Sequence, residues 1–502
     1  MRFKKRFYLF AIFLILAVVV AYAYHFIKTN NKPIMDLPEC KGCNIVLITL
    51  TNVGAEHLGV YGYQRNTSPK LDRFAQDSIV FENAFTQMSW SLPVVASLFT
   101  SEYPITHGLM NRQVLSGTET TLAEILKIYG YETAAFTGGG DYRERYGVNQ
   151  GFSTFKSEQN VTVFTGSFRK STKNAYKWLL NNKGKKFFIF VQGYDAHCPF
   201  EPPENYKSLF DDNYNGTINT SLCIRSLGYK DSNVQTPDTL DAYYFTNMTV
   251  DSSFAVLMPV NITKKDIEHL RTLYDGEVRY VDDLVGGFLE ELGRLGLLNN
   301  TIIIILGDHG ETFGEHGRLV RIGATRGNMY NNVIHIPLII RHPFVKNGKK
   351  IYGLVQIIDI MPTVLDFFGI PLNREAQGKS FVPLIEGRNN SVHEYIFSGG
   401  FFGSTNKILF KHSAVNYAVT SKKWKLIYER STDGEISSLE LYDIENDPNE
   451  LNNLVAEEPE IAMQLKKQML EWEKASIRQR NLKKIELSQE ELKAAREAGY
   501  TD

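Results

Sequence analysis

The 502-residue sequence has few cysteines and almost no excess of charge of either sign. Four cysteines in a chain of this length exclude a small scaffold held together by disulfides. Its 55 lysines and arginines balance 56 acidic residues, so it offers no broad cationic face to a nucleic-acid backbone, and we expect no nucleic acid among its partners. Apolar residues, in contrast, make up 43% of the sequence, which is enough for a large buried core.

Long uncharged apolar sequence is confined to Phe7 to Tyr24. At ~1.5 Å per residue this run spans roughly 27 Å, close to the hydrocarbon thickness of a bilayer. A cluster of Arg2, Lys4, Lys5 and Arg6 precedes the run and outweighs Lys28 and Lys32 beyond it. The positive-inside rule therefore predicts a cytoplasmic N-terminus and a single-pass membrane anchor within residues 1–31, with a periplasmic or extracellular main domain. The alternative is a signal peptide cleaved after Ala21-Tyr22-Ala23.

The cysteines form two candidate pairs, and export would allow both to oxidise. Cys40 and Cys43 lie in a linker over residues 32–43, and their CxxC spacing fits a redox pair, half a zinc site or a local disulfide. We favour the disulfide, because redox pairs open a helix after a strand, whereas this pair precedes an apolar run. Cys198 and Cys223 could pair likewise and tie an insert to the core.

Short apolar runs alternate with helical patterns through most of the chain. Asn44 to Leu50 is a continuous β-branched run, typical of a strand buried on both faces of a parallel sheet. Similar runs are 133–137, 187–191, 301–306 and 336–340, and helical spacing occurs over 68–78, 122–129 and 267–298. This alternation predicts a layered α/β sheet.

Changes of pattern predict the remaining boundaries. We assign residues 44–371 to the main domain, with an insert over about 205–262 that is too long for an ordinary connection. Residues 372–458 contain antiparallel strand patterns and predict a smaller α+β unit. Residues 459–502 are charged and rich in helix formers, which predicts a helical tail.

Candidate site residues occur where ligands bind in doubly wound sheets, beyond the carboxyl ends of the strands. Asp308 and His309 follow one strand in a glycine-rich loop and form a fair metal-ligand pair. His197 follows another and could serve as acid, base or anion-binding donor. Ser91 precedes a helical pattern that opens with proline. A helix N-terminus suits an oxygen nucleophile that attacks a sulfate or phosphate ester, although Ser91 taken alone is more simply an N-cap.

Together and in this order, these pieces resemble the sulfatases of the alkaline-phosphatase superfamily. The resemblance runs from Asn44 to about Asn453 and rests on HLGVYGYQRNTSPKLDRFAQDSIVFENAFTQ, TSEYPITHG, YDGEVRYVDDLVG, LGDHGETFGEHG, HIPLIIRHP, DIMPTVLDFFGIP, and WKLIYER with LELYDIENDPNE. It implies an alkaline-phosphatase-like α/β/α sandwich with a smaller C-terminal α+β domain built on an antiparallel sheet. It also implies a divalent cation, usually calcium, beside a nucleophile that attacks sulfur or phosphorus.

The resemblance also implies roles for individual residues. Asp308 and His309 stand where the family keeps two metal ligands, and Ser91 stands at the nucleophile. His197 matches a substrate-side histidine and is our second catalytic candidate. Arg326 falls near the place of a substrate-binding lysine.

Two departures from the family pattern affect the metal and the nucleophile. Family members carry a metal-binding acid after the first strand, where this chain has Thr51 and Asn52, which offer only neutral oxygens. We therefore predict that a divalent cation, Ca²⁺ by resemblance, is bound weakly or is absent, or that the site uses imidazole nitrogen and a borderline metal. The family nucleophile lies in Cys/Ser-x-Pro-Ser-Arg and is converted to formylglycine. Here Ser91-Leu92-Pro93 is followed by Val94 and Val95, so we expect no formylglycine.

Three functions fit these observations. The first is hydrolysis of sulfate or phosphate monoesters outside the cytoplasm, with Ser91 as nucleophile and a divalent metal at Asp308 and His309. The second is a catalytically inactive relative that binds an anionic glycan or lipid head group. The third is a membrane-bound phosphoryl transferase. In each case the expected partner is an anionic ester on a glycan or lipid.

Overall fold

The computed structural model describes residues 37–110, 113–158, 167–210, 213–218, 220, 226–228, 239–246, 256–317, 328–372, 376–402, 414–431 and 434–478. The predicted anchor at Phe7–Tyr24 lies outside these ranges. Among the helices inside them, none has both the length and the hydropathy that crossing a bilayer requires.

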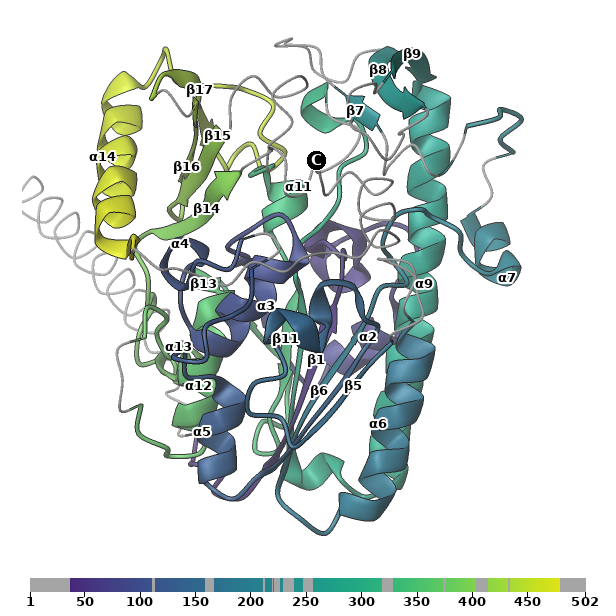
Figure 1. Ribbon diagram of the computed structural model, residues 1–502, viewed down its shortest axis with the longest axis vertical. Helices are drawn as coiled ribbons and strands as arrows, with labels where there is room; N and C mark the ends of the chain where they lie inside the picture. The colour runs from purple at the N-terminus through teal and green to yellow at the C-terminus, as the bar shows by residue number, and fades with distance from the viewer. Residues whose placement is uncertain are drawn as a thin grey trace, which may run out of the picture.

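An eight-stranded sheet forms the centre of the molecule (Figure 1). Its strands, in spatial order, are β12 (Lys349–Ile351), β2 (Ile79–Phe81), β11 (Leu338–Arg341), β10 (Thr301–Gly307), β1 (Asn44–Leu50), β6 (Phe187–Gly193), β4 (Glu132–Thr137) and β5 (Thr154–Ser157). β11 is antiparallel to both of its neighbours, whereas the other neighbouring pairs are parallel. The five apolar runs of the sequence fall in β1, β4, β6, β10 and β11, so the predicted α/β sheet is confirmed.

Helices cover both faces of this sheet. Along β1, Ile45 and Leu47 point into one core and Val46, Ile48 and Leu50 into the other, because successive side chains of a strand alternate between faces. The first core is closed by α3 (Ser91–Thr100), α5 (Leu122–Ile128), α12 (Ile360–Phe367) and α13 (Val382–Glu386), and the second by α2 (Pro69–Ala75), α6 (Phe168–Asn182) and α9 (Lys264–Arg294). The result is an α/β/α sandwich (Figure 1).

A second, antiparallel sheet lies C-terminal to the sandwich. It consists of β14 (Ile396–Phe402), β15 (Ala414–Thr420), β16 (Trp424–Ser431) and β17 (Ile436–Asp443), in that order. Helix α14 (Pro459–Ser476) packs on it through Leu465, Met469 and Trp472 (Figure 1). This confirms the smaller C-terminal α+β unit. The end of the predicted helical tail, from residue 479, lies outside the described residues.

The insert predicted over about 205–262 contains regular structure in its described segments. Strands β7 (Ser226–Gly228), β8 (Thr239–Thr246) and β9 (Val256–Thr263) form a small antiparallel sheet that leads into α9.

The remaining short α-helices and strands of the described chain are β3 (Ala84–Phe85), β13 (Val355–Gln356), α4 (Pro104–His107), α7 (Glu204–Lys207) and α11 (Asn331–Ile334).

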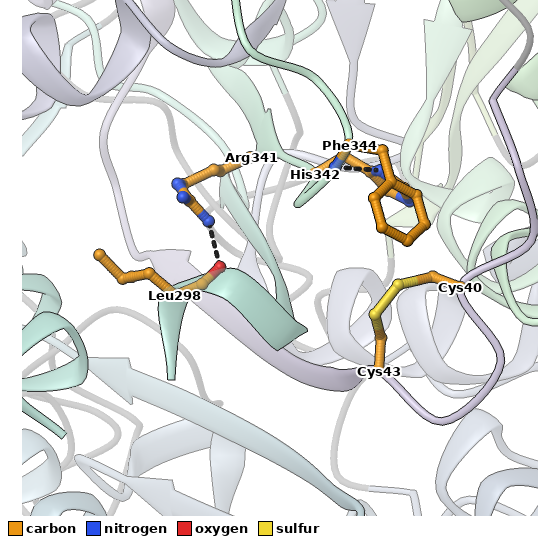
Figure 2. Close-up of a disulfide and its surroundings, with 6 residues drawn as sticks. All are labelled: Cys40, Cys43, Leu298, Arg341, His342 and Phe344. Atoms are coloured by element: carbon orange, nitrogen blue, oxygen red, sulfur yellow. Dashed lines mark hydrogen bonds between the residues drawn. A yellow bond between two sulfur atoms is a disulfide. The ribbon is translucent and has the colours of Figure 1, made fainter. Parts of the chain in front are cut away.

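The linker before β1 is fixed by a disulfide. Cys40 and Cys43 are bonded to each other, as predicted, and the amide of Cys40 donates to the carbonyl oxygen of Phe367 at 2.7 Å. Figure 2 shows the disulfide beside His342, whose ring packs against Phe367. Cys198 is also disulfide-bonded. Cys223, the partner that we predicted for it, lies outside the described residues.

His342 makes the stability of this region sensitive to pH. Its side chain is buried, its Nδ1 accepts from the amide of Phe344 at 3.4 Å, and its Nε2 has no hydrogen-bond partner among the described residues. Burial lowers the pKa of His342 from 6.5 to about 4. The unfolded chain therefore binds this proton more readily, so stability is full above pH 6.5 and falls as the pH drops toward 4, by about 3 kcal/mol.

This acid sensitivity can be measured by urea unfolding at several pH values between 7 and 4. In His342→Leu we expect the slope of unfolding free energy against pH to be shallower than in the wild type. Equal slopes in the two proteins would show that His342 is not the titrating group.

Candidate active site

The carboxyl ends of three central strands meet at one level of the sheet. Leu50, the last residue of β1, is paired in register with Gly193 of β6 and with Gly307 of β10. The loops that begin at Thr51 and Asp308 therefore start side by side. This is the edge at which the sequence predicts ligand binding.

Asp308 is the centre of the site and is fully buried. Its Oδ1 accepts from the amides of Asn52 at 2.9 Å and His309 at 2.8 Å. Its Oδ2 accepts from the hydroxyls of Ser91 at 2.7 Å and Tyr142 at 3.0 Å. Both carboxylate oxygens thus receive two hydrogen bonds from described residues, which is the usual capacity of an ionised carboxylate.

Ser91 is the first residue of α3, with Trp90 in the N-cap position, so the simple N-cap interpretation of Ser91 is wrong. Its side chain is 2% exposed. Its hydroxyl donates to Asp308, in the loop after β10, and does not cap its own helix. Its Oγ also lies 3.4 Å from Nε2 of His309. The sequence prediction that Ser91 and the Asp308-His309 pair form one site is consistent with this geometry.

The imidazole of His309 is oriented by its own loop. Its Nδ1 lies 3.0 Å from the carbonyl oxygen of Gly310, an acceptor, so in the neutral ring Nδ1 carries the proton. Nε2 then holds a lone pair that faces Ser91 Oγ. Oδ1 of Asp308 lies 3.6 Å from the same Nε2, close enough to stabilise a positive charge on the ring.

Thr51 and Asn52 lie in the site, but their polar groups are hydrogen-bonded to β6, to the loop after it and to α9. Thr51 Oγ1 accepts from the side-chain amide of Gln192 at 2.8 Å. Asn52 donates from its side chain to the carbonyl oxygen of Ala196 at 2.8 Å, and its backbone carbonyl accepts from the Tyr274 hydroxyl at 2.7 Å. Asn52 has φ of 63°, a left-handed conformation that asparagine tolerates better than most residues.

Tyr142 is the site residue that the sequence analysis missed. It ends a short 3-10 helix after β4, and its ring is buried against Phe190 and Tyr194. Burial, followed by the negative charge of Asp308, raises the pKa of Tyr142 well above its ordinary value, so its hydroxyl keeps the proton that it donates. A tyrosine in a glycine-rich loop carries no spacing signal that could have identified it.

The structure gives less information on His197 and Arg326, the two residues predicted to lie on the substrate side. His197 is buried in the loop after β6, with Nδ1 2.7 Å from the carbonyl oxygen of Cys198 and its ring edge-on to Tyr194. These contacts leave its catalytic role a prediction. Arg326 lies outside the described residues.

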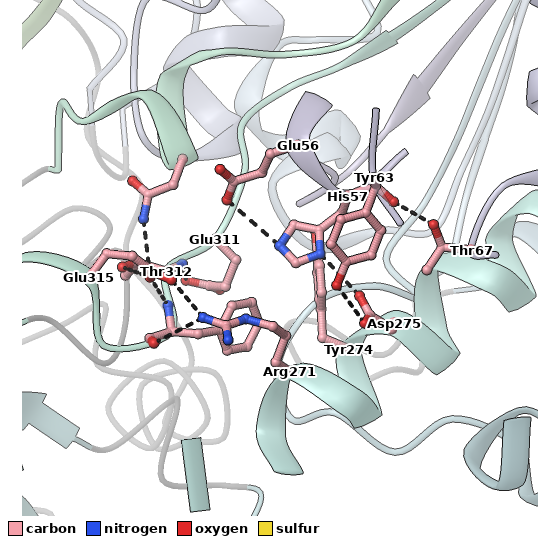
Figure 3. A network of polar contacts seen from close by, with 12 residues as sticks. Glu56, His57, Tyr63, Thr67, Arg271, Tyr274, Asp275, Glu311, Thr312 and Glu315 are labelled. Atoms are coloured by element: carbon pink, nitrogen blue, oxygen red, sulfur yellow. Dashed lines mark hydrogen bonds and ion pairs between the residues drawn. The ribbon is translucent and has the colours of Figure 1, made fainter. Parts of the chain in front are cut away.

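A polar network on α9 supports the loops of the site (Figure 3). Asp275 is buried and receives the hydroxyl of Tyr63 and the guanidinium of Arg65, each at 2.7 Å, while His57 Nδ1 lies 3.0 Å away. These contacts fix the residues that follow Asn52 along the chain to the same helix that supplies Tyr274.

The same helix also fixes the glycine-rich loop that carries Asp308. Arg271 donates to Glu315 at 2.7 Å (Figure 3). Burial alone would raise the pKa of Glu315, but the charge of Arg271 and the amide of Phe313 bring it below its ordinary value. Glu315 is therefore held as a charged partner that ties this loop to α9.

The donors around Asp308 do not fit a hard divalent cation. Such a cation takes six or more oxygen ligands, several of them charged. Here Asp308 is the one carboxylate among the four predicted ligands, and both of its oxygens already face protons. In the described part of the chain, no group of three or more histidine, cysteine, aspartate or glutamate side chains could hold a metal ion.

This fold and this serine-carboxylate site define a protein of the alkaline-phosphatase-like class. The sulfatase family model matches residues 43–370, and the model for the C-terminal part of N-sulphoglucosamine sulphohydrolase matches residues 314–475. The chain belongs to the sulfatase family.

Relatives agree with this assignment. An arylsulfatase of Clostridium perfringens is 26% identical over 83% of this chain and 90% of its own length, and human arylsulfatase K is 25% identical over 85% and 81%. The class that these relatives support is that of sulfuric ester hydrolases.

Solved structures show the same fold. The phosphonate monoester hydrolase of Agrobacterium radiobacter has a TM-score of 0.66 at 19% identity and covers 86% of this chain and 96% of its own. A protein in complex with its substrate D-glucosamine-2-N,6-O-disulfate has a TM-score of 0.68 at 21% identity, over 86% and 98% of the two chains.

Proposed function

We propose that this protein hydrolyses sulfate or phosphate monoesters, with Ser91 as the nucleophile. The observation that carries the proposal is the 2.7 Å hydrogen bond from Ser91 Oγ to Asp308 at the N-terminus of α3, with His309 Nε2 3.4 Å from the same oxygen. A buried hydroxyl between a carboxylate and an imidazole has the arrangement of an activated nucleophile.

The residues present account for each proton in the reaction. Ser91 Oγ forms a bond to sulfur or phosphorus, its proton passes to Nε2 of His309, and the bond to the ester oxygen breaks. The leaving oxygen takes this proton from the His309 imidazolium, which restores the neutral ring for the second step. Asp308 stays ionised and stabilises the imidazolium. In the second step, His309 accepts a proton from water as that water attacks sulfur or phosphorus, and the inorganic anion leaves as the proton returns to Ser91.

An anionic ester on a glycan or lipid is the substrate class that we propose. The positive end of the α3 dipole and the developing imidazolium favour negative charge next to Ser91. The D-glucosamine disulfate bound by the structural neighbour supports a sulfated sugar in the first instance. We place the reaction outside the cytoplasm, because the disulfides at Cys40-Cys43 and Cys198 persist in oxidising compartments.

A non-catalytic relative is the second candidate. It is favoured by the lack of an acid at Thr51 together with the saturated hydrogen bonding of Asp308. In that case the same pocket would bind the anionic group without turning it over.

An activity panel separates the two candidates. The full chain, purified in detergent, would be assayed on aryl sulfate, aryl phosphate and phosphonate monoesters against a mock preparation. We expect turnover of at least one ester above the mock level. We also expect the tryptic peptide containing Ser91 to have the mass of unmodified serine. Absence of turnover on every ester would reject the hydrolase and favour the binding protein.

A further inference from the structure

We infer that this chain has replaced the divalent cation of its family by hydrogen bonds, and that Tyr142 completes the replacement. The inference deepens the proposed function and rests on it for its catalytic consequence. Metal content and stability can be measured whether or not the protein turns over an ester.

Both carboxylate oxygens of Asp308 already accept hydrogen bonds. Two amide nitrogens donate to Oδ1 and two hydroxyl oxygens donate to Oδ2, at donor–acceptor distances of 2.7 to 3.0 Å. A ligated cation needs a lone pair directed at it, so binding to Asp308 would require at least one donor to leave. Four donors also satisfy the charge of this buried carboxylate without a counter-ion.

Tyr142, a hydrogen-bond donor to Asp308 that is not among the predicted metal ligands, is held rigidly by packing. Tyr142 is 1% exposed, its ring stacks on Phe190 of β6 at 5.9 Å between centroids, and Tyr194 packs edge-on at 5.9 Å. Its backbone carbonyl accepts from Thr137 Oγ1 at 2.9 Å. These contacts hold the hydroxyl toward Asp308. If a cation displaced this hydroxyl, the packing of the Tyr142 ring would be disturbed and one hydrogen bond would be lost.

Position 51, directly after β1, has no charged ligand for a cation. A carboxylate at position 51 would be the second charged oxygen of the site, but Thr51 has a neutral hydroxyl that accepts from Gln192. Gln192 in turn accepts from the amide of Gly138 through its side-chain oxygen at 3.0 Å. The hydroxyl at position 51 is thereby built into a chain of hydrogen bonds that runs from β1 through β6 to the end of β4.

Metal analysis of the purified full chain tests the inference directly. We expect far less than one metal ion per chain by elemental mass spectrometry, and a melting temperature that is the same with EDTA as with added Ca²⁺, Mg²⁺, Mn²⁺ or Zn²⁺. One equivalent of bound metal, or a melting temperature that falls in EDTA, would overturn the inference. Turnover in the activity panel is scored separately, so failure of the proposed function would leave this result readable.

Two variants identify the residues responsible. Tyr142→Phe should lower the melting temperature by ~2–4 °C, and by more than the matched control Tyr194→Phe, whose hydroxyl accepts from the amide of Asp141. Thr51→Asp should acquire a melting temperature that rises with Ca²⁺. Equal effects of the two tyrosine variants, or a Thr51→Asp protein that ignores Ca²⁺, would contradict the assignment.

Discussion

Replacing Ser91 by alanine is expected to lower kcat/KM for the best ester of the activity panel by at least ~10³-fold. The variant removes the attacking oxygen and leaves the Asp308-His309 pair without a hydroxyl between them. The measurement is steady-state kinetics on wild type and variant at equal protein concentration.

A second serine of the same helix provides the control for this experiment. Ser97 is buried on α3, and its hydroxyl lies 3.0 Å from Nε2 of His107, away from Asp308. Ser97→Ala therefore tests the cost of losing a buried hydroxyl from α3, and it should keep most of the activity. Activity in Ser91→Ala equal to that in Ser97→Ala would reject Ser91 as the nucleophile.

Replacing Lys425 by methionine is expected to destabilise the protein by about 3–5 kcal/mol. Lys425 of β16 and Glu450 form a buried ion pair at 2.6 Å, and both contact Asn331 at the start of α11. Burial lowers the pKa of Lys425 and raises that of Glu450, so each charge depends on the other. The substitution would leave Glu450 buried without its partner, and urea unfolding monitored by circular dichroism measures the cost.

An exposed pair on the same sheet calibrates the size of this effect. Lys423 lies 3.5 Å from Asp443, and its side chain is 46% exposed. Lys423→Met should therefore change the unfolding free energy by less than about 1 kcal/mol. The double variant Lys425→Met with Glu450→Gln should recover part of the lost stability, because it removes both charges. Similar losses in Lys423→Met and Lys425→Met would contradict the special role of the buried pair.

The sequence was most informative where a residue's position along a strand decides its place in the molecule. The apolar run at Asn44–Leu50 predicts a buried strand, and the ends of β1 and β10 predict that Thr51 and Asp308 are neighbours. Ser91 could be added because its proline-containing helix start resembles the family pattern. These signals are local in the sequence. They predict neighbours in the folded protein because strand register aligns the ends of adjacent strands.

Contacts made by tertiary packing could not be predicted in this way. Tyr142 reaches Asp308 only because Phe190 and Tyr194 fix its ring, and nothing in its own loop indicates that direction. The hydroxyl of Tyr274 on α9 meets Asn52 for a similar reason, since it depends on how a long helix lies across the sheet. Hydrogen-bond partners of this kind are set by the fold as a whole.

The register that pairs Leu50 with Gly193 and Gly307 also limits which residues the ends of these strands can carry. A methyl group at Gly307 would lie 2.4 Å from the carbonyl oxygen of Val53, and one at Gly193 would lie 2.4 Å from the amide nitrogen of Phe168. Both of these neighbours are backbone atoms, so rotation of a side chain cannot relieve the contact. A side chain at either position would therefore force the backbone to shift, so the chemistry of this site can vary only through the side chains around these glycines, such as those at positions 51 and 142.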